Sequence, residues 1–324
     1  MGPETGMKYQ ITQYTLRGAR PVNEDRTGYA ERDNAVIMAV ADGLGGHRGG
    51  DIAAEILLQT LLHVFQMLRQ PVIQRPSVFL ALGILQAHHA IIERGQKNRP
   101  AIEPRTTCVA CLVQNGYAYW AHVGDSRLYL FRQNRLLLRT QDHTTIEQFH
   151  QEGLLTEKEM LEHPQKSHLL NCLGSHLMPT ISVGEETLLQ PGDTLLACTD
   201  GLWEAFAPEE IARYLKAAAL DEGVEEMLLA ARKKMKRSCD NVSAVCLRWE
   251  DAISKSAPLQ GNAAAQINEE LLREEAKHHL PLATRAKPRK PVALASESED
   301  DKSKPLASRI QELEEFLKKF EPKR

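Results

Sequence analysis

The feature of this sequence that most constrains its fold is a set of aspartates, each placed beside a short, strand-like apolar segment. They are Asp25, Asp42, Asp125, Asp200 and Asp240. Taken singly, each is explained by a turn, because Asp and Gly are favoured there. Taken together they require a further explanation, because strands that lie side by side bring their ends to one place. Carboxylates that cluster there repel one another unless a cation neutralises them. The sequence therefore predicts a cation site at one end of a sheet.

The chemistry of such a site follows from its ligands. Oxygen ligands select hard divalent ions such as Mg²⁺ or Mn²⁺ over zinc. Two such ions about 3.5–4 Å apart can share a water and lower its pKa, which makes hydroxide at neutral pH. Arg20 lies close in sequence to Glu24 and Asp25, and its planar guanidinium can hold two oxygens of a phosphate. Together these groups indicate hydrolysis of a phosphoester.

Strand-like and helical segments alternate through residues 1–250. Two amphipathic helices are expected, one after Asp51 and one after Pro76-Ser77 with Ser77 as its N-cap. A hairpin is expected to turn at Gly124-Asp125-Ser126, and such hairpins with amphipathic helices predict an α+β sandwich in which helices cover sheets. The expected strands lie near Val36–Ala41, Cys108–Val113, Tyr117–His122, Leu128–Phe131, Thr194–Cys198 and Val242–Trp249.

Composition excludes some classes of function. The chain is 42% hydrophobic, enough for a core, and its net charge of −3 gives no basic excess to favour nucleic acid. The N-terminus lacks the order of a signal peptide, and no run reaches the ~18 apolar residues that span a bilayer. A cytoplasmic location without membrane contact is therefore expected.

Competing motifs are weaker than the aspartate pattern. The segment Val40–Asp51 reads as a strand, a glycine loop and a helix, but Arg48 stands where a dinucleotide-binding turn needs its third glycine. Neither a P-loop, a zincin motif nor a serine-hydrolase elbow occurs. Cys108 and Cys111 form a C-x-x-C pair, yet they lie in an apolar strand on opposite faces, which favours buried thiols over a zinc site.

The last part of the chain differs in composition. Residues 251–324 are rich in both charges and are expected to be a largely disordered tail. A short amphipathic helix is predicted at about 308–320, with Ser308 and Gln311 as a capping box. Either its own domain or a partner protein can receive the apolar stripe of this helix, which consists of Ile310, Leu313, Phe316, Leu317 and Phe320.

Ten short motifs then identify a family. They are Arg20–Asp25, Ala39–Gly46, Thr106-Thr107, His122–Leu128, Asp142-His143-Thr144, His163-Pro164, Leu173-Gly174, Pro191-Gly-Asp193, Thr199–Leu202 and Asp240-Asn241. In this order they resemble the bacterial-type, metal-dependent protein phosphatases of the type 2C (PPM) family. The resemblance implies a β-sandwich of two mostly antiparallel sheets flanked by antiparallel helix pairs, with the metal centre at one end.

The resemblance also implies roles for single residues. Arg20 would clamp the phosphate, and Glu24 would bind a metal through water. Gly43 would offer its backbone carbonyl to a metal, and Asp125 would bind a third, weaker ion. The ligands of the two main ions would be Asp25, Asp42, Asp200 and Asp240, with Asp42 bridging both.

The chain departs from the family pattern near the site. Leu44 stands where some members carry a histidine taken to be the general acid, and His47 is only a weak substitute. His122 and His143 also lie near the predicted site, but a structural role is favoured for each.

Arg105 replaces the glycine that usually precedes Thr106-Thr107. Residues 143–180 correspond to the variable flap, which either helps to select the substrate or is a solvated surface.

The function implied is hydrolysis of phosphoserine and phosphothreonine in proteins by attack of a metal-bridging hydroxide. Two Mn²⁺ or Mg²⁺ ions would be the cofactors, and a bacterial Ser/Thr kinase would act in opposition. The alternative is a catalytically weak regulatory binding protein on the same fold, whose C-terminal helix recruits partners. All the expected aspartates are present, which favours the enzyme.

Overall fold

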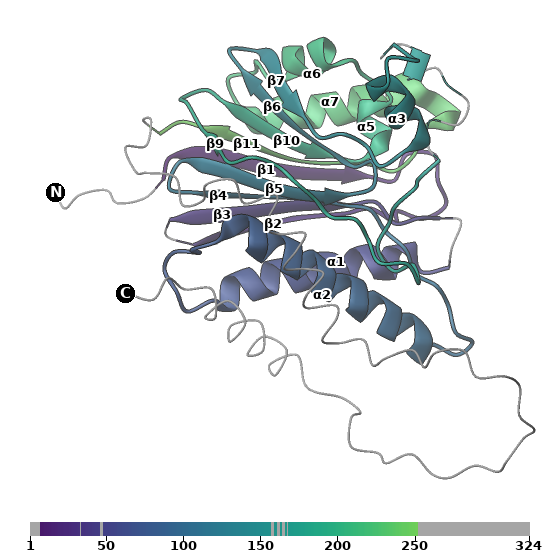
Figure 1. Cartoon of the computed structure of the whole chain (residues 1–324). Helices are drawn as coiled ribbons and strands as arrows, with labels where there is room; N and C mark the ends of the chain where they lie inside the picture. The colour runs from purple at the N-terminus through teal and green to yellow at the C-terminus, as the bar shows by residue number, and fades with distance from the viewer. Residues whose placement is uncertain are drawn as a thin grey trace, which may run out of the picture. The chain divides into compact units, whose positions relative to one another are not determined.

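Two antiparallel sheets pack face to face in the computed structural model, and each carries helices on its other face (Figure 1). The structure describes residues 7–32, 34–45, 48–156, 159–160, 163, 166 and 168–251. The predicted C-terminal helix at 308–320 lies outside these residues, as does the predicted tail apart from Asp251. The predicted α+β sandwich is confirmed.

The first sheet has the strand order β1-β11-β10-β6-β7. Its strands are β1 (Tyr9–Leu16), β11 (Val242–Trp249), β10 (Thr194–Cys198), β6 (Arg127–Arg132) and β7 (Arg135–Arg139). The other sheet has the order β2-β3-β4-β5-β8, with β9 also paired to β5. Its strands are β2 (Arg26–Arg32), β3 (Ala35–Ala41), β4 (Cys108–Gln114), β5 (Tyr117–Val123), β8 (Ser182–Val183) and β9 (Thr187–Leu188).

The helices cover the two sheets in separate groups. The long helices α1 (Gly50–Met67) and α2 (Pro76–Lys97) pack against strands β2 to β5. The first sheet is covered by α5 (Asp200–Trp203), α6 (Pro208–Tyr214) and α7 (Leu220–Met235), followed by a 3₁₀ turn at Lys236–Ser238. Helix α3 (Thr145–Gln151) follows β7 in the chain. No helix among the described residues has the length and apolar character needed to cross a membrane.

The central strands are continuous apolar runs because both of their faces are buried. In β3 every residue is buried; Val36, Met38 and Val40 belong to the core between the sheets. The intervening residues therefore face helices α1 and α2. Cys111 lies in the same core, and Cys108 is a buried free thiol on the opposite face of β4. The prediction of buried thiols is confirmed.

Two local predictions were wrong. Helix α2 starts at Pro76 and its cap position is Arg75, so Ser77 lies inside the first turn and is not the N-cap. Proline is favoured at the first helical position because its φ is already helical and no N–H is lost. The second error concerns Gly124-Asp125-Ser126, because β5 and β6 belong to different sheets and form no hairpin. Gly124, with φ of +99°, instead turns the chain from one sheet to the other.

Candidate active site

The predicted aspartates come together at one end of the two sheets. Asp25 directly precedes β2, Asp42 follows β3 and Asp125 lies between β5 and β6. Asp200 is the first residue of α5 after β10, and Asp240 lies two residues before β11. Burial raises the pKa of Asp42 well above its usual range, and the charges of the other four aspartates raise it further. Carboxylates affect one another in this way only at short range, so the five aspartates lie near one another, as their positions at strand ends predicted.

Asp25 is held by the neighbouring sheet. The Thr199 hydroxyl donates a hydrogen bond to Oδ2 of Asp25 at 2.9 Å, and the Ser243 backbone N–H donates to the same hydroxyl oxygen at 3.1 Å. Burial raises the pKa of Asp25 to about 7, although hydrogen bonds from Ser243 and Thr199 act in the opposite direction. The contact links the start of β2 to β10 and β11, and so joins the two sheets at the site.

The backbone of Asp42 is fixed by the Thr106-Thr107 pair. The Asp42 carbonyl accepts from the Thr106 hydroxyl at 2.8 Å and from the Thr107 N–H at 2.9 Å. The Asp42 N–H donates to the Thr107 hydroxyl at 3.1 Å, and that hydroxyl is 2.7 Å from the Ser126 hydroxyl. Both threonines are fully buried. They therefore set the position of Asp42 relative to Ser126 and its neighbour Asp125.

Gly43 allows three chain segments to meet. A Cβ atom at this position would lie 2.5 Å from the Gly50 backbone at the start of α1 and 2.6 Å from the Glu24 carbonyl oxygen. Only glycine tolerates such an approach. Burial raises the pKa of the Glu24 carboxyl, with a further contribution from Asp51. Glu24 thus lies against the same glycine loop as Gly43, and its contact with a metal through water stays a prediction.

Arg20 lies beside Asp240. Its guanidinium Nη2 is 2.5 Å from Oδ2 of Asp240, and the arginine side chain is 56% exposed. Asn241 holds the loop that carries Arg20, because its side-chain amide donates to the Arg17 carbonyl and its side-chain oxygen accepts from the Glu24 N–H. Arg20 therefore lies at the cluster with its side chain open to solvent, and its role as a phosphate clamp stays a prediction.

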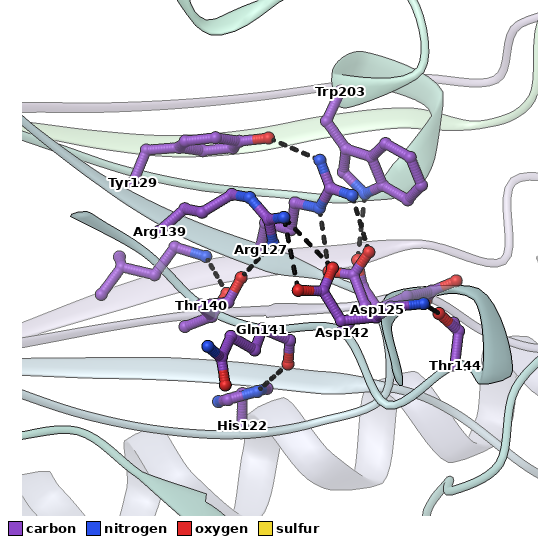
Figure 2. Close-up of polar contacts among 12 residues, drawn as sticks. His122, Asp125, Arg127, Tyr129, Arg139, Thr140, Gln141, Asp142, Thr144 and Trp203 are labelled. Atoms are coloured by element: carbon purple, nitrogen blue, oxygen red, sulfur yellow. Dashed lines mark hydrogen bonds and ion pairs between the residues drawn. The ribbon is translucent and has the colours of Figure 1, made fainter. Parts of the chain in front are cut away.

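Trp203 links the helix that begins at Asp200 to Asp125, and Figure 2 shows its contact with Asp125. Trp203 belongs to the helix that Asp200 begins, and its indole N–H donates to the Asp125 carbonyl at 3.0 Å. The Arg127 guanidinium lies 3.7 Å from the centre of the Trp203 ring. It also donates from Nε and Nη2 to the two oxygens of Asp142, at 2.9 and 2.6 Å. This ion pair is buried on both sides, and it holds the guanidinium against the tryptophan ring.

The two histidines of this region have structural contacts. The Nδ1 atom of His143 accepts from the Gly124 N–H at 3.1 Å, and its Nε2 lies 2.9 Å from the Ser182 hydroxyl. The ring stacks on His122, whose Nε2 contacts the Gln141 carbonyl at 2.8 Å (Figure 2). Burial lowers the pKa of His143 to about 4. These contacts agree with the structural role favoured for both, whereas His47 lies outside the described residues.

The cluster has the chemistry of a site for hard divalent cations. Its side-chain donors are carboxylate oxygens, and Oδ1 of Asp200 is buried without a hydrogen-bond partner in the described part of the chain. A buried carboxylate oxygen without a partner is costly, and a cation would satisfy it. Among the described residues, however, no group of three or more His, Cys, Asp or Glu side chains is placed so that it could hold a metal ion, and the fit is one of donor chemistry. The ligand set therefore fits hard cations, and the individual ligand roles stay predictions.

The sequence was compared with models of known protein families. The protein phosphatase 2C family model matches residues 16–239, which include Asp25, Asp42, Asp125 and Asp200. The chain belongs to the protein phosphatase 2C family. The predicted membership of this family is confirmed.

Bacterial relatives of this phosphatase 2C chain extend the comparison. The serine/threonine phosphatase stp of Listeria welshimeri is 32% identical over 200 residues, which cover 60% of this chain and 78% of the relative. The structure resembles that of Stp1 from Staphylococcus aureus, with a TM-score of 0.70, 25% identity and coverage of 78% of this chain and 99% of that one. It also resembles the catalytic domain of the phosphatase PstP in complex with two manganese ions, with a TM-score of 0.61, 26% identity and coverage of 75% and 99%.

Sequence reasoning missed the residues that hold the cluster of this phosphatase 2C chain in place. Arg127, Trp203 and Tyr129 were assigned no role, although Arg127 and Trp203 lie within or beside matched motifs. Tyr129 accepts from the Arg127 Nη1 at 3.1 Å (Figure 2). A signal was present in Arg127, which directly precedes the apolar run Leu128–Phe131, because a buried arginine needs a partner.

The raised pKa values make a prediction about stability and pH. Burial raises the pKa of Asp125 to about 7, against an ordinary value near 3.8. A carboxyl with a raised pKa in the folded state contributes most stability below its unfolded pKa, and the contribution is lost as the pH rises through about 7. In chelator-treated protein, Asp125→Asn should therefore raise the melting temperature at pH 8 and raise it less at pH 5, with a free-energy gain of about 1–3 kcal/mol at pH 8.

The matched control is Glu226→Gln, which removes an exposed carboxylate from α7. Its melting temperature should follow that of the unmodified chain at both pH values. Mn²⁺ should then stabilise the unmodified chain more than Asp125→Asn, since the ion neutralises the repulsion that the variant has already removed. A melting temperature of Asp125→Asn that falls at pH 8 without metal would contradict this account.

Proposed function

We propose that this chain is a metal-dependent serine/threonine protein phosphatase that hydrolyses phosphoserine and phosphothreonine in proteins. The observation that carries the proposal is the convergence of aspartates from four other segments around Asp42. Membership of the protein phosphatase 2C family and relatives named serine/threonine phosphatases support it. Divalent-metal dependence is supported by the ligand chemistry and by the manganese complex of a similar catalytic domain.

The residues that would hold the ions are those of the cluster. We assign two Mn²⁺ or Mg²⁺ ions to Asp25, Asp42, Asp200 and Asp240 with the Gly43 carbonyl, a weaker third ion to Asp125, and a contact through water to Glu24. The bound ions would supply positive charge for the phosphoryl oxygens and activation of the attacking water. Asp42 is central to this assignment, because the charge of each of the other four aspartates raises its pKa.

Arg20 is the residue proposed to bind the phosphate. Its guanidinium can grip two oxygens of a phosphate in a planar fork. It first has to give up its contact with Asp240, but a half-exposed ion pair is worth only about 0–1 kcal/mol. The exchange also frees the Asp240 carboxylate for its proposed role as a metal ligand. One side chain thus links binding of the substrate to the arrangement of the ligands.

The alternative of a catalytically weak regulatory protein is not favoured. It would be supported by loss of a cluster aspartate, and all of them are present and brought together. The opposing Ser/Thr kinase, a partner for the C-terminal helix and a cytoplasmic location stay predictions.

Turnover by the full-length chain tests the proposal. With Mn²⁺ we expect release of phosphate from a phosphothreonine peptide and from p-nitrophenyl phosphate, and a loss of at least about 100-fold with excess chelator. Adding back Mn²⁺ should restore the rate, and the same series with Mg²⁺ shows which ion is preferred. Absence of turnover on every phosphorylated substrate, with either ion, would refute the proposed function.

A further inference from the structure

A cavity of about 520 Å³ lies beside the candidate site, at the flap. Its walls combine amide and hydroxyl side chains with apolar ones. Leu170 and Leu177, which line it, are 50% and 78% exposed. Exposed leucines next to hydrogen-bonding side chains suit a peptide, because its aliphatic and polar parts can both be matched.

Two walls of the cavity are joined to the aspartate cluster through hydrogen bonds. The Arg105 carbonyl accepts from the Leu44 N–H at 3.0 Å, two residues beyond Asp42. On another side, His143 accepts from the N–H of Gly124, which directly precedes Asp125. A chain segment that enters the cavity therefore lies near a phosphorylated residue bound at the cluster.

Arg105 gives the cavity its charge. It is the one lysine or arginine among the described residues that line the cavity. The lining carboxylate, Asp142, is neutralised by its buried ion pair with Arg127 (Figure 2). The Arg105 guanidinium contacts Glu103 through Nη2 at 2.8 Å, while its Nε is buried without a partner in the described part of the chain. Because Glu103 is half exposed, this contact is weak and can be exchanged for another anion.

We propose that this cavity is a subsite for a residue that flanks the phosphorylated serine or threonine, and that Arg105 makes it select an acidic side chain or a second phosphate. The inference rests on the proposed phosphatase activity and adds a substrate preference to it. A second anion would replace Glu103 on the guanidinium, and an arginine fork binds carboxylates and phosphates alike. A basic flanking residue would be repelled.

The test compares phosphothreonine peptides that differ at one flanking position, with Glu, phosphoserine, Ala or Lys at each position in turn. We expect kcat/KM for the Glu or the phosphoserine peptide to exceed that for the Ala peptide by about fivefold at one position or more, and the Lys peptide to be poorest. Arg105→Gln should bring these ratios close to one. Glu103→Gln, which removes the competing carboxylate, should increase them.

The matched control is Arg94→Gln, which removes an exposed arginine from the last turn of α2 and should leave the ratios unchanged. Rates on p-nitrophenyl phosphate, which has no flanking residue, normalise each variant for folding and for the reaction centre. Equal kcat/KM for all flanking residues in the unmodified chain would overturn the subsite while the phosphatase function stood. Ratios that survive Arg105→Gln, or that fall in Glu103→Gln, would overturn the role of Arg105, and no turnover on any substrate would overturn both proposals.

Discussion

The Asp42→Asn variant should lose at least about 10³-fold in kcat/KM on both a phosphothreonine peptide and p-nitrophenyl phosphate. Asp42 is the carboxylate on which the charges of Asp25, Asp125, Asp200 and Asp240 all act. Asparagine keeps the size of the side chain but removes its charge and one oxygen ligand. The loss should exceed the roughly 10- to 100-fold typical of residues that only support a metal ligand. Steady-state kinetics at saturating Mn²⁺ measure it.

We expect the Asp42→Asn variant to lose activity while it keeps its fold. The Thr106 and Thr107 bonds to Asp42 involve its backbone, so they survive the substitution. Without metal, the variant should be at least as stable as the unmodified chain at pH 8, because one charge has left a repulsive cluster. Asp221→Asn, at an exposed carboxylate near the start of α7, is the activity control. Turnover that survives Asp42→Asn would refute the assigned site.

The strands that sequence analysis predicted well are those buried on both faces. The bounds of β10 and β11 agree with the prediction, because a continuous apolar run marks where a strand starts and ends. The strands β1, β2 and β7 were not predicted. Their residues are mostly half-buried or exposed, and β7 in particular carries arginine at both ends. Such strands are specified by their neighbours in the sheet and not by their own pattern.

The pairing of β6 shows a second limit of the sequence. Its nearness to β5 in the chain predicted a hairpin, yet β6 pairs with β10 and β7. Leu128 and Leu130 face the core between the sheets, while Tyr129 and Phe131 face helices α5 to α7. A strand with two buried faces fits several positions in a sandwich. The choice among them depends on packing partners that lie far away in the sequence.

The candidate site shows the same division. Its aspartates were predicted because a turn at the end of a strand is a local feature that the sequence alone reveals. The side chains that support them could not be assigned, since the contacts of Arg127 span to Asp142 and to Trp203 in other elements. Likewise, Arg105 was predicted only as a departure from a family motif. The cavity that it lines is formed by segments from 105 to 182, and only the folded chain brings them together.

The second large effect is expected at Arg127, whose side chain and that of Asp142 are each only 4% exposed. Arg127→Leu leaves the Asp142 carboxylate buried without its partner, which should lower the free energy of unfolding by about 3–5 kcal/mol. For a domain of this size, that loss corresponds to a fall of about 10 °C in melting temperature. The contact with the Trp203 ring is lost as well, so the indole that donates to Asp125 becomes free to move. Activity on p-nitrophenyl phosphate should therefore fall by about 10- to 100-fold in the protein that remains folded.

The double variant Arg127→Leu, Asp142→Leu separates the two consequences. Removing both charges abolishes the unpaired buried carboxylate, so most of the lost stability should return. Activity should stay low, because leucine does not replace the cation above the Trp203 ring. Lys97→Ala, which breaks an exposed i,i+4 pair with Glu93 on α2, should change the stability by less than about 0.5 kcal/mol. If the double variant recovers activity together with stability, the ion pair acts on the fold alone, and its proposed influence on Asp125 and Asp200 through Trp203 is wrong.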